Sequence, residues 1–344
     1  MVGDKVRGNI AVTIRWGIIG FGRFGRIHAD VLAGLDGAEV IGICSRREVE
    51  PSLLPAGVVS VDRDVEHFVN RQDLDVILVA THWRDHFAAA SSALNAGKHL
   101  FLEKPMAATR EECEQLLAIA ERARGISMVG HICRFDARVW MAREAILAGQ
   151  IGRIVYMRSR RNLPVAPGSV RLDKVSPLIG DGVHDADLMM WFMGRGPSRV
   201  YGTTVKTHRF TFDDIGCAWL HFDSAAVGYV ETVWCLPETS PTVIDAHLEV
   251  IGTEGKLAID CSVTGLEITT SKGVKRSDTD YWPLIDGYRQ GALRDELRYF
   301  VDCIRRGVCP RRVTLREAAR AVAVMLRAEE SAKENRPLDF EDLA

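Results

Sequence analysis

The stretch that decides the fold is residues 14–25, which read IRWGIIGFGRFG. The apolar run Ile14–Ile19 predicts a buried strand, and a helical pattern follows the glycines. Gly20 permits a tight turn, Gly22 lets the backbone approach a pyrophosphate, and Gly25 lets helix and strand pack closely. The free N–H groups at the start of the helix favour phosphate. We therefore predict a dinucleotide-binding turn made of Gly20, Phe21, Gly22, Arg23, Phe24 and Gly25.

Strand-like and helix-like segments alternate through the first 130 residues. The strand-like segments are short apolar runs bounded by glycine, aspartate or other charged residues: Thr13–Ile19, Glu39–Cys44, Asp75–Ala80, Lys98–Leu102 and Ile126–Gly130. The helix-like segments are Phe24–Ala33, Asp85–Asn95 and Thr109–Arg124. In the last of these, Thr109 and Glu112 have the spacing of a capping box. This alternation predicts a Rossmann-type, doubly wound parallel sheet.

The pattern changes after residue 150. One more helix is expected at Ala137–Ala148, and candidate strands follow it, several of which alternate apolar and polar residues. The strands are Arg153–Arg160, Arg199–Lys206, Gly216–Phe222, Gly228–Cys235, His247–Ile251, Lys256–Asp260 and Gly265–Thr270, and helices at Ala292–Arg306 and Thr314–Glu334 close the chain. We predict an α/β protein with a dinucleotide-binding domain at 1–130 and an α+β substrate and oligomerisation domain with an open-faced mixed or antiparallel sheet at 131–312. The C-terminal helix, at 313–344, is expected to pack back on the first domain.

The end of the second strand indicates the type of dinucleotide. NAD sites carry an Asp or Glu about 20 residues beyond the glycines. Here the strand ends in Ser45-Arg46-Arg47, without a carboxylate. A hydroxyl and a guanidinium can hold a 2′-phosphate, which a carboxylate would repel. We expect NADP in preference to NAD; the alternative is that both arginines are solvated loop residues.

Glu103-Lys104-Pro105 follows the fourth strand. Ligands of open α/β sheets gather outside the carboxyl ends of the strands, so Lys104 is expected to point into the cofactor crevice. The alternative is a surface lysine at a strand exit. Pro105 allows a cis peptide bond before it.

A histidine and three aspartates gather at the start of a helix in residues 180–192, GDGVHDADLMMWF. A histidine beside carboxylates can act as a general base near neutral pH, which makes His184 a candidate. Two other interpretations stay open: Asp181 or Asp185 caps the helix, or His184 binds a metal. No third metal ligand of suitable spacing is evident, so we expect no metal site.

The composition excludes several classes of protein. The 344 residues are 47% hydrophobic and 26% charged, as is typical of a soluble globular chain. With 44 basic and 46 acidic residues the net charge is −2, so no general attraction to nucleic acid or anionic membrane is expected. No apolar run approaches the ~18–20 residues of a membrane span, and Met1–Ile14 lacks the apolar stretch of a secretory signal. Eight cysteines without a Cys-x-x-Cys pair indicate a reduced, cytoplasmic protein.

Further motifs extend from the glycine-rich turn to the last helix. They are Ala80–His86, Ala96–His99 running into Glu103–Pro105, Arg134-Phe135, Gly182–Asp187, Gly252–Gly255 and Arg312–Thr314. Together with Gly20–Gly25 they resemble the glucose–fructose oxidoreductase/inositol dehydrogenase/MocA (Gfo/Idh/MocA) family over nearly the whole chain. The resemblance implies a Rossmann domain, an open-faced mixed sheet, and NAD(P)-dependent oxidation or reduction of a sugar, sugar-acid, polyol or cyclitol carbon.

The resemblance also implies roles for individual residues. Lys104 matches the family lysine that orients the reacting hydroxyl, and His184 matches the catalytic histidine. Family members commonly carry an aspartate four residues before that histidine, where this chain has Gly180. Either Asp181 replaces it after a small shift and completes the catalytic set, or the carboxylate is absent. His82 stands where proline is usual, and Ser45 stands where NAD-using members often have aspartate.

The expected binding residues form two sets. Besides the glycine-rich turn, the cofactor is expected to contact Ser45, Arg46, Arg47, Ala80, Thr81, His82, His86, Glu103, Lys104 and Arg134. The substrate is expected to contact Lys104, Arg160, Asp181, His184 and Asp187. Arg158, Arg160 and Arg161 are interpreted as following a strand, where they would bind an acidic group of the substrate or form a solvated strand end.

We expect an NAD(P)-dependent dehydrogenase or reductase that acts on CH–OH groups of a small molecule. His184 would take the hydroxyl proton as hydride leaves, and Lys104 would donate a hydrogen bond. The alternatives are a non-catalytic NAD(P)-binding regulatory protein and a reductase of a cyclic non-sugar substrate.

A homo-oligomer, dimer or tetramer, is also expected. Trp219, Tyr229, Val233 and Trp234 fall on sheet faces that one layer of helices cannot all cover.

Overall fold

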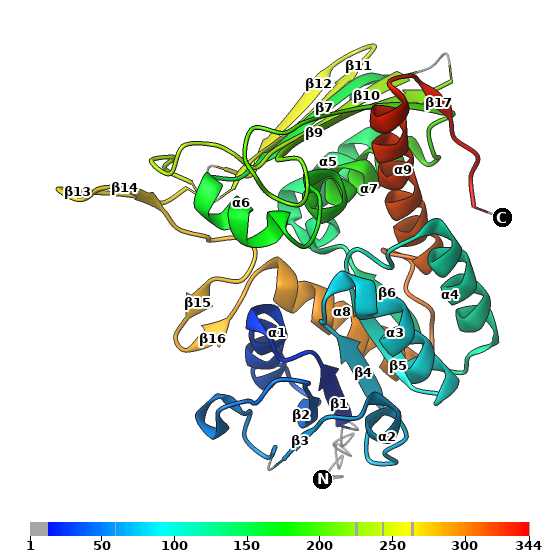
Figure 1. Cartoon of the computed structure of the whole chain (residues 1–344), viewed down its shortest axis with the longest axis vertical. Helices are drawn as coiled ribbons and strands as arrows, with labels where there is room; N and C mark the ends of the chain where they lie inside the picture. Colours follow the sequence, from blue (N-terminus) through cyan, green and yellow to red (C-terminus); the bar gives the residue numbers. More distant parts are fainter. Residues whose placement is uncertain (1–12, 59, 224–225, 243, 263–264, 344) are drawn as a thin grey trace, which may run out of the picture.

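Two sheets, one below the other in Figure 1, form the framework of the molecule. The computed structural model describes residues 13–343 apart from residues 59, 224–225, 243 and 263–264. Most of the segment Met1–Ile14, expected not to be a secretory signal, therefore lies outside the described residues. None of the helices in the described ranges is long and apolar enough to cross a membrane.

The first sheet has six strands, all parallel, in the order β3-β2-β1-β4-β5-β6. The strands are β1 (Ile14–Ile19), β2 (Ala38–Cys44), β3 (Val61–Asp62), β4 (Val76–Val79), β5 (His99–Glu103) and β6 (Ser127–Gly130). Its helices are α1 (Arg23–Ala33), α2 (Val65–Val69), α3 (His86–Asn95) and α4 (Arg110–Arg122). The predicted doubly wound Rossmann sheet is confirmed. Because β2 and β4 flank β1 on opposite sides, the strand order reverses there, which is where such sheets bind ligands.

A helix from late in the chain also covers this sheet. Phe300 of α8 (Ala292–Arg306) packs edge-on against Trp16 and Phe101, with ring centroids 6.0 and 5.7 Å apart. The expected division placed residues 131–312 in the second domain, yet α8 lies in the core of the first sheet.

The second sheet has seven strands in the order β12-β11-β7-β10-β9-β8-β17. They are β7 (Ile154–Asn162), β8 (Arg199–Val205), β9 (Ile215–Phe222), β10 (Ala226–Val233), β11 (Asp245–Gly252), β12 (Lys256–Asp260) and β17 (Leu338–Asp339). Only β7 and β10 pair in parallel; the other pairs are antiparallel, so the predicted mixed sheet is confirmed. Helices α5 (Ala137–Leu147), α7 (Val183–Met193) and α9 (Leu315–Glu334) lie below it in Figure 1.

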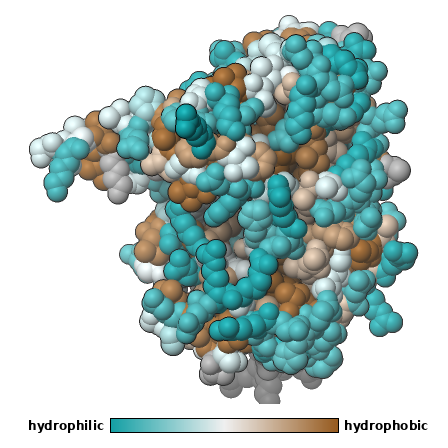
Figure 2. Space-filling model, in the orientation of Figure 1, coloured by the Kyte–Doolittle hydropathy of each residue, from teal (hydrophilic) through white to brown (hydrophobic). Residues whose placement is uncertain are grey.

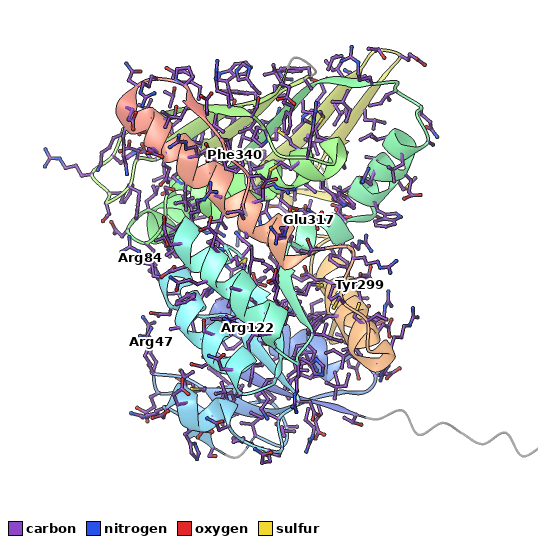
Figure 3. The ribbon with its side chains drawn as sticks, turned by 90° about the vertical axis from the view of Figure 1, so that its right-hand side faces the viewer. Arg47, Arg84, Arg122, Tyr299, Glu317 and Phe340 are labelled. Carbon is purple, nitrogen blue, oxygen red and sulfur yellow. The ribbon has the colours of Figure 1, made fainter. Side chains whose placement is uncertain are left out.

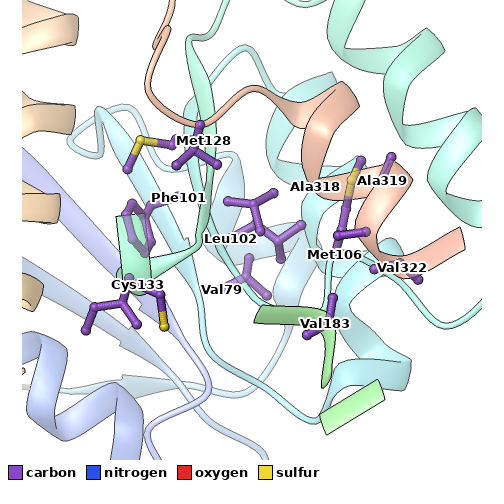
Figure 4. Packing of buried hydrophobic residues seen from close by; sticks show 14 of the residues in the cluster. Val79, Phe101, Leu102, Met106, Met128, Cys133, Val183, Ala318, Ala319 and Val322 are labelled. Atoms are coloured by element: carbon purple, nitrogen blue, oxygen red, sulfur yellow. The ribbon is translucent and has the colours of Figure 1, made fainter. Parts of the chain in front are cut away.

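Helix α9 joins the two sheets. It starts with the predicted capping box of Thr314 and Glu317. It lies directly on β8, where the Gly202 N–H donates to Ser331 Oγ at 3.0 Å and a side chain on Gly202 would collide with α9. Figure 4 shows its residues Ala318 and Val322 in one buried cluster with side chains of the first sheet and of α7. The two units therefore share a continuous core.

Several short elements were not predicted from the sequence. They are β3, α2, α6 (Val165–Leu172), the hairpin β15–β16 (Leu284–Ile285 and Tyr288–Arg289) and the second strand of the hairpin β13–β14 (Glu267–Thr270 and Gly273–Arg276). The hairpin β13–β14 extends away from the body of the molecule (Figures 1 and 2). Elements of two to eight residues carry too few apolar repeats to be recognised from periodicity. All eight cysteines are free thiols.

Candidate functional site

The glycine-rich turn lies between β1 and α1, and two of its glycines are required by the protein itself. Gly20 has a φ of 92°, and a Cβ there would lie 2.7 Å from the carbonyl of Ala80 at the end of β4. A Cβ on Gly25 would collide with the carbonyl oxygen of Gly20. Gly20 therefore makes the turn and Gly25 the close contact of helix with strand, as predicted.

Gly22 differs, because a Cβ there would meet no protein atom within 4 Å. Nothing in the surrounding protein explains a glycine at this position, whereas the close approach of a ligand does. Gly22 is also the N-cap of α1, with no side-chain cap and no acidic residue in the first turn. The N–H groups and the positive end of the helix dipole are thus free for phosphate, so these residues fit a dinucleotide.

The end of β2 carries no carboxylate. Ser45 is buried, and its hydroxyl donates to the Arg47 carbonyl oxygen at 2.9 Å and accepts from the Arg47 N–H at 3.2 Å. Arg46 is largely exposed and forms an ion pair with Asp85 at 2.5 Å. Arg47 projects from the outer edge of the molecule in Figure 3. The two guanidinium groups therefore border the carboxyl edge of the sheet, with one of them already paired.

The segment Ala80–His86 follows β4 and forms the next wall of the crevice. His82 caps the short helix η2 (Trp83–Asp85), and Thr81 Oγ1 donates to the carbonyl oxygen of His82. The buried His86 donates from Nδ1 to the Pro105 carbonyl oxygen at 2.8 Å, so it ties α3 to the segment after β5. Trp83 Nε1 donates to the Lys174 carbonyl oxygen at 2.9 Å, which links this wall to the residues just beyond α6.

Lys104 reaches from the end of β5 to the segment that precedes α7. Its Nζ donates to the Gly180 carbonyl oxygen at 2.5 Å and lies 3.5 Å from Asp181 Oδ1. The peptide bond between Lys104 and Pro105 is cis. Burial lowers the pKa of Lys104, although the Asp181 carboxylate acts in the opposite direction. Lys104 is therefore part of an interaction between the two sheets and not a free surface lysine.

Asp181 supplies the carboxylate beside Lys104. Residues Leu178–Gly182 form one π-helical turn, η4, that leads into α7. A Cβ on Gly180 would lie 2.5 Å from Cη2 of Trp234, so the Trp234 ring excludes an aspartate from that position. The carboxylate beside Lys104 therefore comes from position 181. Burial acts to raise the pKa of Asp181, but Arg171 and Lys104 together hold that pKa below its ordinary value.

His184 lies one turn further along, at the start of α7. It is buried, and its Nδ1 has no hydrogen-bond partner among the described residues. Its ring packs edge-on against the buried ring of His131, with centroids 6.0 Å apart. Burial, followed by the positive charges of Lys104 and Arg161, lowers the pKa of His184 well below 6.5. The imidazole is thus neutral at neutral pH and able to accept a proton.

Two buried arginine–aspartate pairs fix α7. Arg161 of β7 donates from Nε and Nη2 to the two carboxylate oxygens of Asp185, at 3.1 and 3.0 Å. Arg134 of η3 (Ile132–Phe135) does the same to Asp187, at 2.8 and 2.6 Å. Neither aspartate caps the helix, which has no side-chain cap. Both pairs are bidentate, so they hold the helix by orientation as well as by charge.

Four of the expected site residues form hydrogen bonds or ion pairs with other residues of the protein. Glu103 accepts from His28 Nε2 at 2.8 Å and so ties β5 to α1. Arg134 and Asp187 are nearly inaccessible and bind each other. Arg160 lies within β7 on the open face of the sheet, opposite to Arg161, and pairs with Asp245 at 2.9 Å. The sequence interpretation placed the arginines after the strand, but β7 continues to Asn162.

Two residues of the cluster, Arg171 and His131, were missed as site residues, and Arg161 was expected only to bind an acidic group of the substrate or to form a solvated strand end. Arg171 of α6 donates from Nη1 to both oxygens of Asp181, at 3.2 and 3.1 Å. Arg161 and His131 approach His184 from β7 and from the segment after β6. Arg171 and His131 are isolated residues of common types, so no pattern in the sequence identifies them as site residues. No group of His, Cys, Asp and Glu within the described ranges has the arrangement of a metal site.

Comparison with known proteins agrees with this arrangement. Residues 14–131 match the model of an oxidoreductase family with an NAD-binding Rossmann fold, and residues 139–258 match the GFO/IDH/MocA C-terminal domain. The scyllo-inositol 2-dehydrogenase (NAD(+)) of Bacillus subtilis is 26% identical over 86% of this chain and 88% of its own. The myo-inositol 2-dehydrogenase of Thermotoga maritima is 25% identical over 96% and 99%. The structure of scyllo-inositol dehydrogenase from Lactobacillus casei with NAD(H) and scyllo-inositol superposes with a TM-score of 0.80 at 23% identity, covering 95% of this chain and 99% of that one.

Replacement of Arg161 by leucine should destabilise the protein strongly. The change would leave Asp185 buried without its partner, which costs ~3–5 kcal/mol in comparable pairs. Urea unfolding of the variant measures the loss. Arg158→Leu is the matched control, because Arg158 lies on the same strand but is 52% exposed and should cost at most about 1 kcal/mol. Equal losses in the two variants would show that the buried pair does not hold α7.

Proposed function

Because the chain belongs to the Gfo/Idh/MocA family of oxidoreductases, with its NAD-binding Rossmann fold, we propose that it transfers hydride between a nicotinamide dinucleotide and a CH–OH carbon of a polyol or cyclitol. The observation that carries the proposal is the meeting of Lys104, Asp181 and His184 at the carboxyl edge of the parallel sheet. The inositol dehydrogenases among its relatives support the substrate class. A spectrophotometric assay with inositols and a panel of polyols, following the absorbance of reduced nicotinamide, tests it directly.

The first sheet would hold the dinucleotide. The glycine-rich turn and the start of α1 would bind the pyrophosphate through backbone N–H groups, and Ser45 and the arginines after β2 would bind the adenosine ribose. The segments after β4 and β5 would contact the nicotinamide, which supplies or accepts the hydride when the cofactor is bound. Positioning of this kind supplies much of the rate enhancement in two-substrate reactions.

His184 takes the proton of the substrate hydroxyl. Because the imidazole is neutral at neutral pH, one ring nitrogen has a free lone pair. Nδ1 is buried, so Nε2 is the nitrogen that contacts the hydroxyl. Lys104 donates a hydrogen bond to the same oxygen and orients it. Asp181 and the Gly180 carbonyl hold the Lys104 ammonium in place. General base catalysis of this kind contributes about 10²–10⁴-fold.

Loss of either group should reduce turnover without loss of cofactor. We expect His184→Ala and Lys104→Ala each to lower kcat by ~10²-fold or more, with cofactor affinity nearly unchanged. The double variant should lose much less than the product, because both groups act on one hydroxyl. Asp181→Asn should also lower kcat, since it weakens the hold on Lys104. His67→Ala, at an exposed position of α2, is the control; a His184→Ala enzyme with most of its turnover would refute the assignment.

The pH profile of polyol oxidation should reflect both shifted pKa values. Because the pKa of His184 lies well below 6.5, kcat/KM should stay constant as pH falls to 6.5 and decline only below it. Because burial lowers the pKa of Lys104 below 10.5, the loss of its charge should cause an alkaline decline with a midpoint below 10.5. Initial rates across this range measure both limbs. An acid limb centred above pH 6.5 would contradict the role of His184.

NADP is proposed as the preferred form of the cofactor. The support is the absence of a carboxylate at Ser45 and the presence of Arg46 and Arg47 beside it, although the Bacillus subtilis relative carries NAD(+) in its name and the Lactobacillus casei structure contains NAD(H). Ser45→Asp combined with Arg46→Ala should reverse the preference. Dissociation constants for NADP and NAD, measured on both proteins, decide it. Equal or tighter binding of NAD by the unaltered protein would overturn this part of the proposal.

A homo-oligomer formed through the open face of the second sheet is proposed as well. Tyr201, Trp219 and Tyr229 are in register across β8, β9 and β10, and the Trp219 and Tyr229 rings are 4.7 Å apart. Trp234, also expected on an uncovered face, is instead buried between Gly168 and Gly180. Light scattering should give a multiple of the 38.1 kDa chain, and Trp219→Lys should reduce it. A monomer mass at micromolar concentration would refute the oligomer.

The eight free cysteines favour a reducing compartment, so we propose the cytoplasm as the location.

A further inference from the structure

A second polar cavity lies on the side of α7 that faces the start of α9. Its volume is about 230 Å³. Its walls come from η3, α5, α7 and α9, and its principal lining residues are Arg134, Arg143, Trp191, Arg311, Glu317 and Arg320. Figure 3 shows Glu317 at the start of α9, with Tyr299 of α8 nearby. The cavity includes neither the glycine-rich turn nor Lys104 and His184.

The cavity has an excess of positive charge. Four arginines line it, against the two carboxylates of Asp187 and Glu317. Both carboxylates already bind Arg134, at 2.6 and 3.1 Å, and Arg320 pairs with Asp342 at 2.7 Å. Arg143 and Arg311 form no ion pair with any residue in the described part of the chain. Two guanidinium groups therefore line the cavity without a direct ion-pair partner among the described residues, although the carboxylates of Glu144 and Glu317 act on Arg143 from farther away.

Arg143 is held by a contact that leaves its donors free, whereas the donors of Arg134 are already used. The guanidinium carbons of Arg134 and Arg143 lie 4.9 and 5.2 Å from the centre of the Trp191 ring. Stacking on an aromatic face fixes a guanidinium but does not use the N–H groups in its plane. Arg311 is fixed through its backbone, whose N–H donates to the Tyr299 hydroxyl at 2.8 Å. The Arg143 guanidinium and the Arg311 backbone are thus positioned before any ligand arrives, while the Arg311 side chain is exposed.

The electrostatics of Arg143 favour an anion beside it. Burial, and then the nearby charge of Arg134, lower the pKa of Arg143, against the smaller opposite effects of Glu144 and Glu317. The cations in this cavity repel one another, so a negative ligand between them would relieve that repulsion. The first turn of the 20-residue helix α9, with the positive end of its dipole, borders the same space.

We propose that this cavity is a binding site for a compact multivalent oxyanion, either a phosphate group or a pair of carboxylates, gripped by Arg143 and Arg311 over the Trp191 ring. Guanidinium groups bind both chemistries through paired, charge-assisted hydrogen bonds. The volume admits a small metabolite but not a dinucleotide. The site is separate from the proposed active site, and its ligand does not take part in hydride transfer.

Calorimetric titration of inorganic phosphate and of malonate tests the proposal. The titrations use the full chain with saturating NAD(P), so that the phosphate sites of the cofactor are filled, at an ionic strength held constant with chloride. We expect saturable binding of at least one anion to the unaltered protein. Arg143→Gln combined with Arg311→Gln should weaken it at least tenfold. Arg63→Gln combined with Arg209→Gln removes the same charge from exposed positions elsewhere and should leave the affinity unchanged.

Thermal unfolding without added anion checks that both double variants remain folded. Binding of phosphate alone assigns a phosphate ligand, binding of malonate alone assigns a dicarboxylate, and either result supports the site. The proposal is overturned if neither anion binds saturably, or if both double variants bind with equal affinity. Because no turnover is measured, the outcome is independent of the proposed dehydrogenase activity.

Discussion

The two buried arginine–aspartate pairs on α7 are the constraint on which the rest of the site depends. A buried charge is costly unless it is paired in good geometry, so Asp185 must face Arg161 and Asp187 must face Arg134. Arg161 belongs to the second sheet, and Arg134 follows the last strand of the first. One placement of α7 satisfies both pairs at once. That placement determines where His184, immediately before Asp185, lies.

The proposed site therefore lies where the two sheets meet, and neither sheet forms it alone. Lys104 comes from the first sheet, whereas Gly180, Asp181 and His184 precede or begin a helix packed on the second. The shared core around α9 keeps these parts together without any covalent link near the site. The glycine-rich turn, by contrast, is closed by local contacts with Ala80.

Local patterns predicted the fold, and long-range pairing limited the prediction of the site. The glycines, the strand–helix alternation and the capping box at Thr314 each depend on residues a few positions apart, so the sequence displays them. Asp185 and Asp187 were visible too, but their partners lie 24 and 53 residues away. Arg160 and Arg161 were misjudged because a strand end could not be located, and one residue decides which face of a sheet a side chain occupies. The exclusion of a side chain from position 180 follows from Trp234, which no local pattern connects to Gly180.

The charges around α7 also identify which group can accept a proton in the proposed reaction. Asp181 is held by two cations, Arg171 and Lys104, which keep its pKa low and make it a poor base. Both oxygens of Asp185 are occupied by Arg161. Lys104 donates to Gly180 and can accept a proton only after losing its charge. Of these groups, His184 combines a lone pair with a pKa depressed by burial and by surrounding cations, so the same arginines and lysine that neutralise the aspartates help to keep the histidine in its basic, uncharged form.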